Sequence, residues 1–179
     1  MAGIQRDGDV IVLRLAREER PFLASFAAGL AELLEPSDPP LETDPLAAFV
    51  GISAGPVDKP DDPALRRLLP DAYTDADGAA EFRRLTDADL RATKVANLRR
   101  IVDGATAAGG VVRIAPDEVD GWLAGINDIR LVMGERLEIS EDVEHPDDLD
   151  ADDPRLPLLW AYYWFSELQE RIVDLLMGD

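Results

Sequence analysis

Residues 122–139, WLAGINDIRLVMGERLEI, constrain the fold most, because their apolar side chains recur at the spacing of an α-helix. Pro116, Asp117 and Glu118 stand just before them, and proline with acids in a first helical turn favours a helix start. The pattern therefore predicts one long helix packed on a core. The residues of its apolar stripe follow one another at intervals of three or four: Trp122, Ile126, Ile129, Met133 and Leu137.

The same periodicity predicts further helices on both sides of this segment. At residues 86–89, TDAD, a threonine stands three residues before an acid, which resembles a capping box and predicts a helix start. The last predicted helix is apolar on every side from Leu158 to Phe165. Such a helix is either buried in the domain centre or shared with a partner, which a homodimer would supply. The predicted helices span about 17–35, 64–69, 79–84, 87–103 and 156–177.

A small sheet completes the predicted fold. Residues 3–15 read as a hairpin with a turn at Asp7-Gly8, and VVRI at 111–114 is the natural third strand. We therefore expect a mainly α (α+β) fold, a helical bundle around the apolar C-terminal helix with a two- or three-stranded antiparallel sheet. We expect residues 1–179 to form one domain, with a proline-rich surface excursion at 36–63 and an acidic loop at 140–155.

The charge of the chain limits its partners. The formal net charge is -19, with 37 acidic against 18 basic residues. A field of that sign repels phosphate backbones and anionic lipid at long range. Membrane binding is not expected, and DNA binding is disfavoured unless a local basic patch supplies it.

The reactive residue types are nearly missing. There are no cysteines and one histidine, so disulfides, cysteine nucleophiles, thiolate metal sites and multi-histidine sites are excluded. His145 lies in the acidic loop, which lacks the glycine and closing glutamate of an EF-hand. We expect no catalytic residue, no metal and no cofactor. The N-terminus lacks a signal-peptide pattern and the apolar run at 156–165 is shorter than a span of ~20 residues, which favours a cytoplasmic protein.

One basic stretch, residues 83–100, stands out against the acidic background. It would suit contact with DNA or with a protein partner. The order helix, turn, helix, strand over 79–114 is compatible with a winged helix-turn-helix. The alternative is a solvated helix face whose arginines pair with nearby acidic loops. The contact candidates are Arg83, Arg84, Arg91, Lys94, Arg99 and Arg100.

A polar stripe interrupts the long helix of residues 122–139. Asn127, Arg130 and Gly134 lie at spacings of three and four and share one helix face. One interpretation is a groove in which glycine admits another backbone while Asn127 and Arg130 form hydrogen bonds. The other is an internal brace, because a buried arginine needs several partners.

The same segment resembles the signature of an actinobacterial family. The pattern runs through Trp122-Leu123, residues 126–131, Gly134 and Arg136-Leu137, and the helices at 83–104 and 158–176 also fit. This family, long catalogued as a domain of unknown function, is identified with AosR-like oxidative-stress transcriptional regulators. Its polar signature positions here are Asn127, Asp128, Arg130, Gly134 and Arg136.

The resemblance implies a regulator of the stress response that acts through partners, such as DNA together with a sigma factor of RNA polymerase. No catalytic residue is carried over, and direct thiol sensing is not transferable to a chain without cysteine. The leading hypothesis is thus a non-enzymatic regulatory and interaction protein. The alternative is an acidic adaptor linked to regulated proteolysis, which would bind protein partners only.

Overall fold

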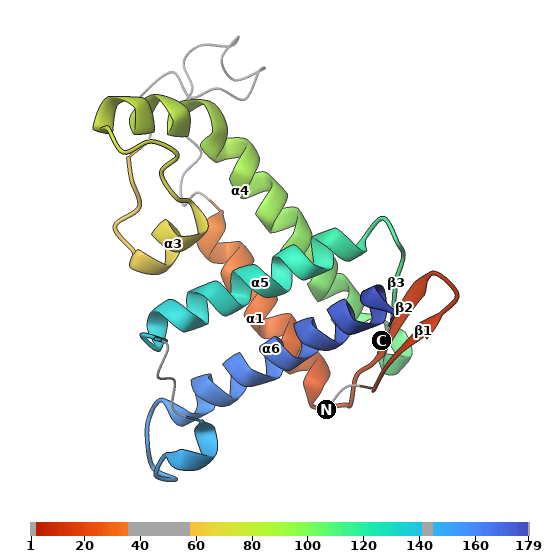
Figure 1. The fold of residues 1–179 in the computed structure, drawn as a ribbon. Helices are drawn as coiled ribbons and strands as arrows, with labels where there is room; N and C mark the ends of the chain where they lie inside the picture. The colour runs from red at the N-terminus through yellow and green to blue at the C-terminus, as the bar shows by residue number, and fades with distance from the viewer. Residues whose placement is uncertain (1–2, 36–57, 141–144, 179) are drawn as a thin grey trace.

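The structure is a computed structural model that describes residues 3–35, 58–140 and 145–178 (Figure 1). Over these residues the chain is mainly helical with a small sheet, as the sequence predicted. Most of the expected 36–63 excursion and the start of the 140–155 loop lie outside the described residues. The elements in chain order are β1 (Gly3–Asp7), β2 (Val10–Arg14), α1 (Glu19–Leu34), α3 (Pro63–Leu68), α4 (Ala76–Thr106), a 3-10 turn (Ala108–Gly110), β3 (Val111–Ile114), α5 (Val119–Arg136), a 3-10 turn (Pro146–Asp148) and α6 (Leu156–Met177).

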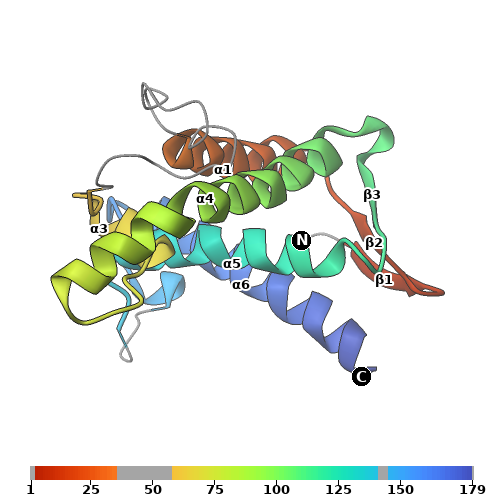
Figure 2. The ribbon, with the colours of Figure 1, turned by 90° about the horizontal axis from the view of Figure 1, so that it is seen from above.

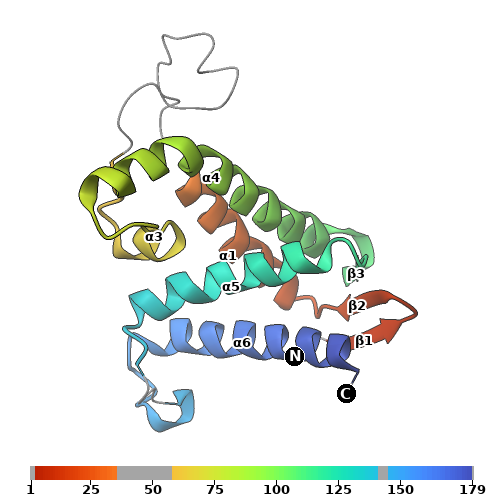
Figure 3. The same ribbon diagram turned by 45° about the horizontal axis from the view of Figure 1, so that its top comes forward.

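The helices form layers with α5 in the middle. α1 and α4 lie side by side, α5 crosses beneath them, and α6 runs antiparallel to α5 on the far side (Figures 2 and 3). α5 packs against α1, α3, α4 and α6. α6 lies along one side of α5, where it buries Phe165 completely but leaves 49% of the surface of Trp160 exposed. In the described residues, no helix has the length and apolarity needed to cross a membrane.

The sheet is antiparallel with the order β1-β2-β3, which confirms the predicted hairpin and its third strand. Asp7 pairs with Val10 across the tight turn, where Gly8 adopts a φ of 63°. Gly109 and Gly110, with φ of 84° and 69°, turn the chain from α4 into β3. Positive φ is costly for other residues, which explains two consecutive glycines there. The sheet packs against the core through three buried side chains, Ile11, Leu13 and Ile114.

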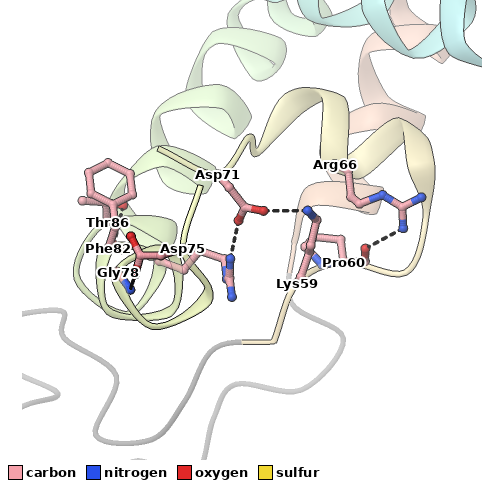
Figure 4. Close-up of polar contacts among 9 residues, drawn as sticks. Lys59, Pro60, Arg66, Asp71, Asp75, Gly78, Phe82 and Thr86 are labelled. Atoms are coloured by element: carbon pink, nitrogen blue, oxygen red, sulfur yellow. Dashed lines mark hydrogen bonds and ion pairs between the residues drawn. The ribbon is translucent and has the colours of Figure 1, made fainter. Parts of the chain in front are cut away.

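α4 is one unbroken helix of 31 residues, so the predicted start at residues 86–89 is wrong. The Thr86 hydroxyl donates to the Phe82 carbonyl at 2.8 Å inside the helix. The true N-cap is Asp75, whose carboxylate accepts from the Gly78 N–H at 2.7 Å (Figure 4). Because no turn divides residues 76–106, the structure also rules out a helix-turn-helix at 79–114.

Asp71 fixes the segment that leads into α4. Its carboxylate lies between the Lys59 ammonium, at 2.6 Å, and the Arg83 guanidinium (Figure 4). These hydrogen bonds, chiefly the one from Lys59, lower the pKa of Asp71. The contact ties residues on both sides of α3 to the first turns of α4.

The opposite end of α4 is capped by a side chain from α1. Arg20 donates to the carbonyl oxygens of Ala105 at 3.2 Å and Ala107 at 2.5 Å. A guanidinium at a helix C-terminus satisfies carbonyls that lack intrahelical partners and complements the helix dipole. α1 and α4 are thus joined by charge as well as by their apolar faces.

α5 begins at Val119, three residues after the expected proline start, because the Glu118 side chain accepts from the Ala115 N–H and holds the preceding turn. Its predicted stripe is confirmed from Trp122 to Met133, where Ile126 and Ile129 are also buried, while Leu137 is the C-cap and only partly buried. Gly104, which follows the predicted helix 87–103, lies inside α4 against Trp122. A Cβ built on Gly104 would stand 2.7 Å from the indole. The two helices therefore cross at a distance that glycine sets.

Replacing Gly104 by alanine tests this crossing. The methyl group would meet the buried Trp122 ring and Val112, so we expect the free energy of unfolding to fall by about 1–3 kcal/mol. The matched control is Gly29→Ala on α1, where nothing lies within 4 Å of the new Cβ. Its better helix propensity should raise stability by up to about 1 kcal/mol. Urea titrations followed by circular dichroism measure both, and equal effects at the two sites would contradict the tight crossing.

Candidate functional site

A buried ion pair joins α4 to α5. Lys94 Nζ lies 2.7 Å from Asp128 Oδ1, with side-chain exposures of 16% and 5%. Two residues predicted for different sites are therefore partners of each other. Lys94 belongs to the basic stretch of residues 83–100, and Asp128 is one of the polar signature positions. The pair lies between the two helices, and little of either side chain reaches solvent.

The Asp128 carboxylate is only half satisfied. Its second oxygen, Oδ2, is buried and has no hydrogen-bond partner among the described residues. Burial raises the pKa of Asp128, and the hydrogen bond and charge of Lys94 oppose that rise. The charged form of Asp128 therefore depends on Lys94.

Arg130 braces α5 against α6. Its Nε donates to Ser166 Oγ at 2.9 Å and its Nη1 donates to Gln169 Oε1 at 2.7 Å. The guanidinium also lies 5.6 Å from the ring centroid of Tyr162, within cation–π range. Arg130 is thus bound from three side chains of one neighbouring helix.

Asn127, Arg130 and Gly134 line one hollow of about 360 Å³, so the structure does bring the predicted stripe together. Arg67, Glu135 and Tyr162 also line it. Gly134 does not admit a close backbone, since a Cβ there would meet only ordinary contacts at 3.8 Å or more.

Arg136, the last residue of the signature, points elsewhere. It contacts Asp62, the N-cap of α3, at 2.6 Å. Burial acts to raise the pKa of Asp62, but hydrogen bonds from the Ala64 N–H and from Arg136, with the nearby arginine charges, outweigh it and lower the pKa. The signature positions therefore serve three neighbours, with Asp128 facing α4, Arg130 facing α6 and Arg136 facing α3.

The basic stretch is a set of separate internal contacts along α4. Only Arg99 and Arg100 are exposed, and the other four side chains are partly covered. Each cation has a hydrogen-bond partner among the described residues, and for five of the six that partner includes a carboxylate, which balances most of the charge of the stretch. The contacts are Arg83 with Asp71, Arg84 with Glu81, Arg91 with Asp87 and the Leu34 carbonyl, Lys94 with Asp128, Arg99 with Glu35, and Arg100 with Asn97.

A larger hollow, which sequence reasoning missed, lies between the start of α1 and the first half of α6. We call it the aromatic groove, with a volume of about 860 Å³. Its signal in the sequence is the tryptophan-rich run at 158–165 followed by glutamates, which predicts a helix that is either buried in the domain centre or shared with a partner but does not predict a groove. The side chains that form it are Glu18, Glu19, Phe22, His145, Pro157, Trp160, Ala161, Tyr163, Trp164, Ser166, Glu167 and Glu170.

In the described part of the chain, no group of three or more acidic or histidine side chains is arranged to hold a metal ion. His145 instead lies against Tyr163, with ring centroids 5.0 Å apart. Its Nδ1 accepts from the Asp147 N–H at 3.3 Å. The described part of the acidic loop is thus attached to the edge of the aromatic groove.

Fold and sites together define an acidic, mainly helical protein whose buried charges join helices and whose open hollow is aromatic. The family model described as Domain of unknown function (DUF2017) matches residues 1–176, so the chain belongs to that family. This confirms the resemblance found in the sequence.

Curated relatives cover nearly the whole chain. The oxidative stress regulator AosR of Mycobacterium tuberculosis H37Rv is 32% identical over 188 residues, 97% of this chain and 85% of the relative. The protein of the same name from Mycobacterium bovis gives the same values. A relative from Mycobacterium leprae is 30% identical over 92% of this chain and 81% of its own length. No solved structure matches. The names of these relatives support a regulatory role.

Lys94→Met tests the buried pair. It leaves the Asp128 carboxylate without its cation, and we expect a loss of about 3–5 kcal/mol in unfolding free energy at neutral pH. The folded pKa of Asp128 is already raised, so the folded chain holds this proton more tightly than the unfolded chain. Stability from this group is therefore present in acid and lost as pH rises through the folded pKa. The deficit of Lys94→Met should narrow in mild acid, as urea titrations at several pH values would show.

The control for this pair is the double variant Lys94→Met/Asp128→Leu. An apolar pair of similar volume avoids an unpaired buried charge, so its stability should lie near that of the original chain. A double variant as unstable as Lys94→Met would contradict the assignment of the loss to the orphaned carboxylate.

Arg130→Lys tests the brace. An ammonium cannot reproduce the two-pronged donation to Ser166 and Gln169, so we expect a loss of about 1–2 kcal/mol. Hydrogen exchange should speed up in the first half of α6. Arg171→Lys is the matched control, because Arg171 is 35% exposed and lies 3.9 Å from Glu167, and its effect should stay below about 0.5 kcal/mol. Equal changes in both variants would argue against a brace.

Proposed function

We propose that this chain is a non-enzymatic regulator of the oxidative-stress response that acts by binding a protein partner. The regulatory part rests on the oxidative stress regulators that it resembles over 97% of its length. A sigma factor of RNA polymerase is the partner class that the family resemblance implies. The single observation that favours protein over DNA is that five of the six cations of the basic stretch are paired with carboxylates, while Arg100 contacts the amide oxygen of Asn97.

The electrostatics support this choice. Binding to DNA draws most of its affinity from cations that replace the counterions of the phosphates. Here five of the six cations of the basic stretch are paired with carboxylates, while the chain as a whole carries a charge of -19. A phosphate backbone would have to break these contacts against an unfavourable field. A protein partner with basic residues on its surface would neither break these contacts nor meet an unfavourable field.

The non-enzymatic part rests on what the polar residues do. Asp128, the carboxyl with a raised pKa, is enclosed with Lys94 in the helix crossing. Arg130 is occupied by Ser166, Gln169 and Tyr162. A side chain that acts on a substrate must reach it, and both of these are committed to neighbouring helices.

The second candidate, an acidic adaptor in regulated proteolysis, shares the preference for protein partners. The excess of acidic over basic residues, which gives the chain a net charge of -19, favours the adaptor because such a surface suits a basic protein partner. It differs in the partner, which would be a protease component or its substrate. Capture of a sigma factor would separate the two candidates in favour of the regulator.

The proposal is tested with labelled promoter DNA and with a purified sigma factor from the same organism. We expect no saturable DNA binding by fluorescence anisotropy at physiological salt, and a stable complex with the sigma factor by size-exclusion chromatography. Arg99→Gln/Arg100→Gln removes the two exposed cations of α4 without touching the buried pair, and should leave the protein complex unchanged. Tight DNA binding that this variant loses would overturn the proposal and move the contact to α4.

A further inference from the structure

We propose that the aromatic groove binds an amphipathic helical segment of a partner protein, one with arginines or lysines beside its apolar face. The inference rests on the proposed function only in needing a protein partner, and it adds where the partner docks and what chemistry it carries. The occupant follows from three properties of the groove: an exposed apolar floor, a fixed shape and an acidic rim.

The floor is aromatic and open to water. Trp160 has 49% of its surface exposed, and Phe22, Tyr163 and Trp164 lie beside it, each partly covered. Large aromatic side chains dominate the energetics of interfaces when a partner covers them. A hollow of about 860 Å³ between two helices suits the apolar face of a third helix.

The floor is fixed before any partner arrives. The Trp164 indole N–H donates to Glu19 Oε1 at 3.3 Å, and the other oxygen of Glu19 accepts from the Ala16 N–H at 2.8 Å. The Trp164 ring packs edge-on against Phe22 and Phe165, with centroids 5.2 and 5.0 Å away. A preformed surface loses less conformational entropy on binding than one that must be ordered.

The rim is acidic and selects the occupant. Glu18, Glu167 and Glu170 border the groove, and no arginine or lysine is among the described residues that line it. Glu18 and Glu170 are exposed, whereas Glu167 lies 3.9 Å from Arg171 on the same helix. Cations on the partner would meet carboxylates at the rim and aromatic faces on the floor. The same rim repels nucleic acid and acidic peptides.

The test uses a synthetic 18-residue helix of leucine and arginine, and a matched helix of leucine and glutamate. Trp160 and Trp164 report binding by fluorescence, while Trp122, with 3% exposure, lies away from the groove. We expect the arginine peptide alone to shift the emission to the blue, with an affinity that falls as salt rises. Trp160→Ala should weaken binding about tenfold, as loss of a central aromatic contact does.

Two double variants of equal net charge distinguish binding at the groove from nonspecific electrostatic attraction. Glu18→Lys/Glu170→Lys should weaken binding of the arginine peptide about tenfold. Glu32→Lys/Asp103→Lys changes two exposed acids on α1 and α4 that do not line the groove, and should leave binding within about twofold. Equal weakening by both variants would overturn the proposal. All four substituted acids are exposed, so the comparison holds even if Trp160→Ala proves unstable.

Two further outcomes would also overturn it. If the sigma factor binds the original chain and Glu18→Lys/Glu170→Lys equally well, the partner docks elsewhere, and the proposed function stands without this site. If sedimentation shows a dimer that Trp160→Ala separates into monomers, a second copy of the chain occupies the groove. Loss of sigma-factor binding in the rim variant, with the control variant unaffected, is the result that the proposal predicts.

Discussion

The close crossing of α4 and α5 is the constraint on which the rest of the structure depends. Gly104 lets the two backbones approach, Trp122 fills the space beside it, and Lys94 meets Asp128 further along the same interface. α5 also contacts α1, α3 and α6, so the position of every other helix follows from this crossing. Protein interiors are packed too densely for one such contact to shift alone.

The parts of the fold that periodicity governs were predictable. The stripe from Trp122 to Met133 became the buried face of α5, and the Asp7-Gly8 hairpin formed with the expected third strand. The prediction failed at Thr86, where a local pattern fits a helix interior as well as a helix start. Such hydroxyls bond backward to a carbonyl one turn earlier, and only the structure shows which bond forms.

The sites could be predicted only as far as local helix geometry determines them, because their other contacts come from residues distant in the sequence. Spacing placed Asn127, Arg130 and Gly134 on one face correctly, because that follows from helix geometry alone. It could not reveal that Lys94 belongs to Asp128, or that Arg20 caps α4 from 85 residues away. The aromatic groove was missed for the same reason. An apolar run looks the same in sequence whether its tryptophans are covered or left open.

The order of the strands has a consequence for how the chain folds as it is made. β2 pairs on one side with β1, its neighbour in sequence, and on the other with β3, about 100 residues later. While the ribosome is still synthesising α4, the edge of β2 that later pairs with β3 is therefore still open, and α1 lacks the helix that covers it. Closing such a distant pairing is slow compared with forming a local helix. The nascent hairpin edge is thus the part of this protein most open to a chaperone or to aggregation until Val111–Ile114 emerges.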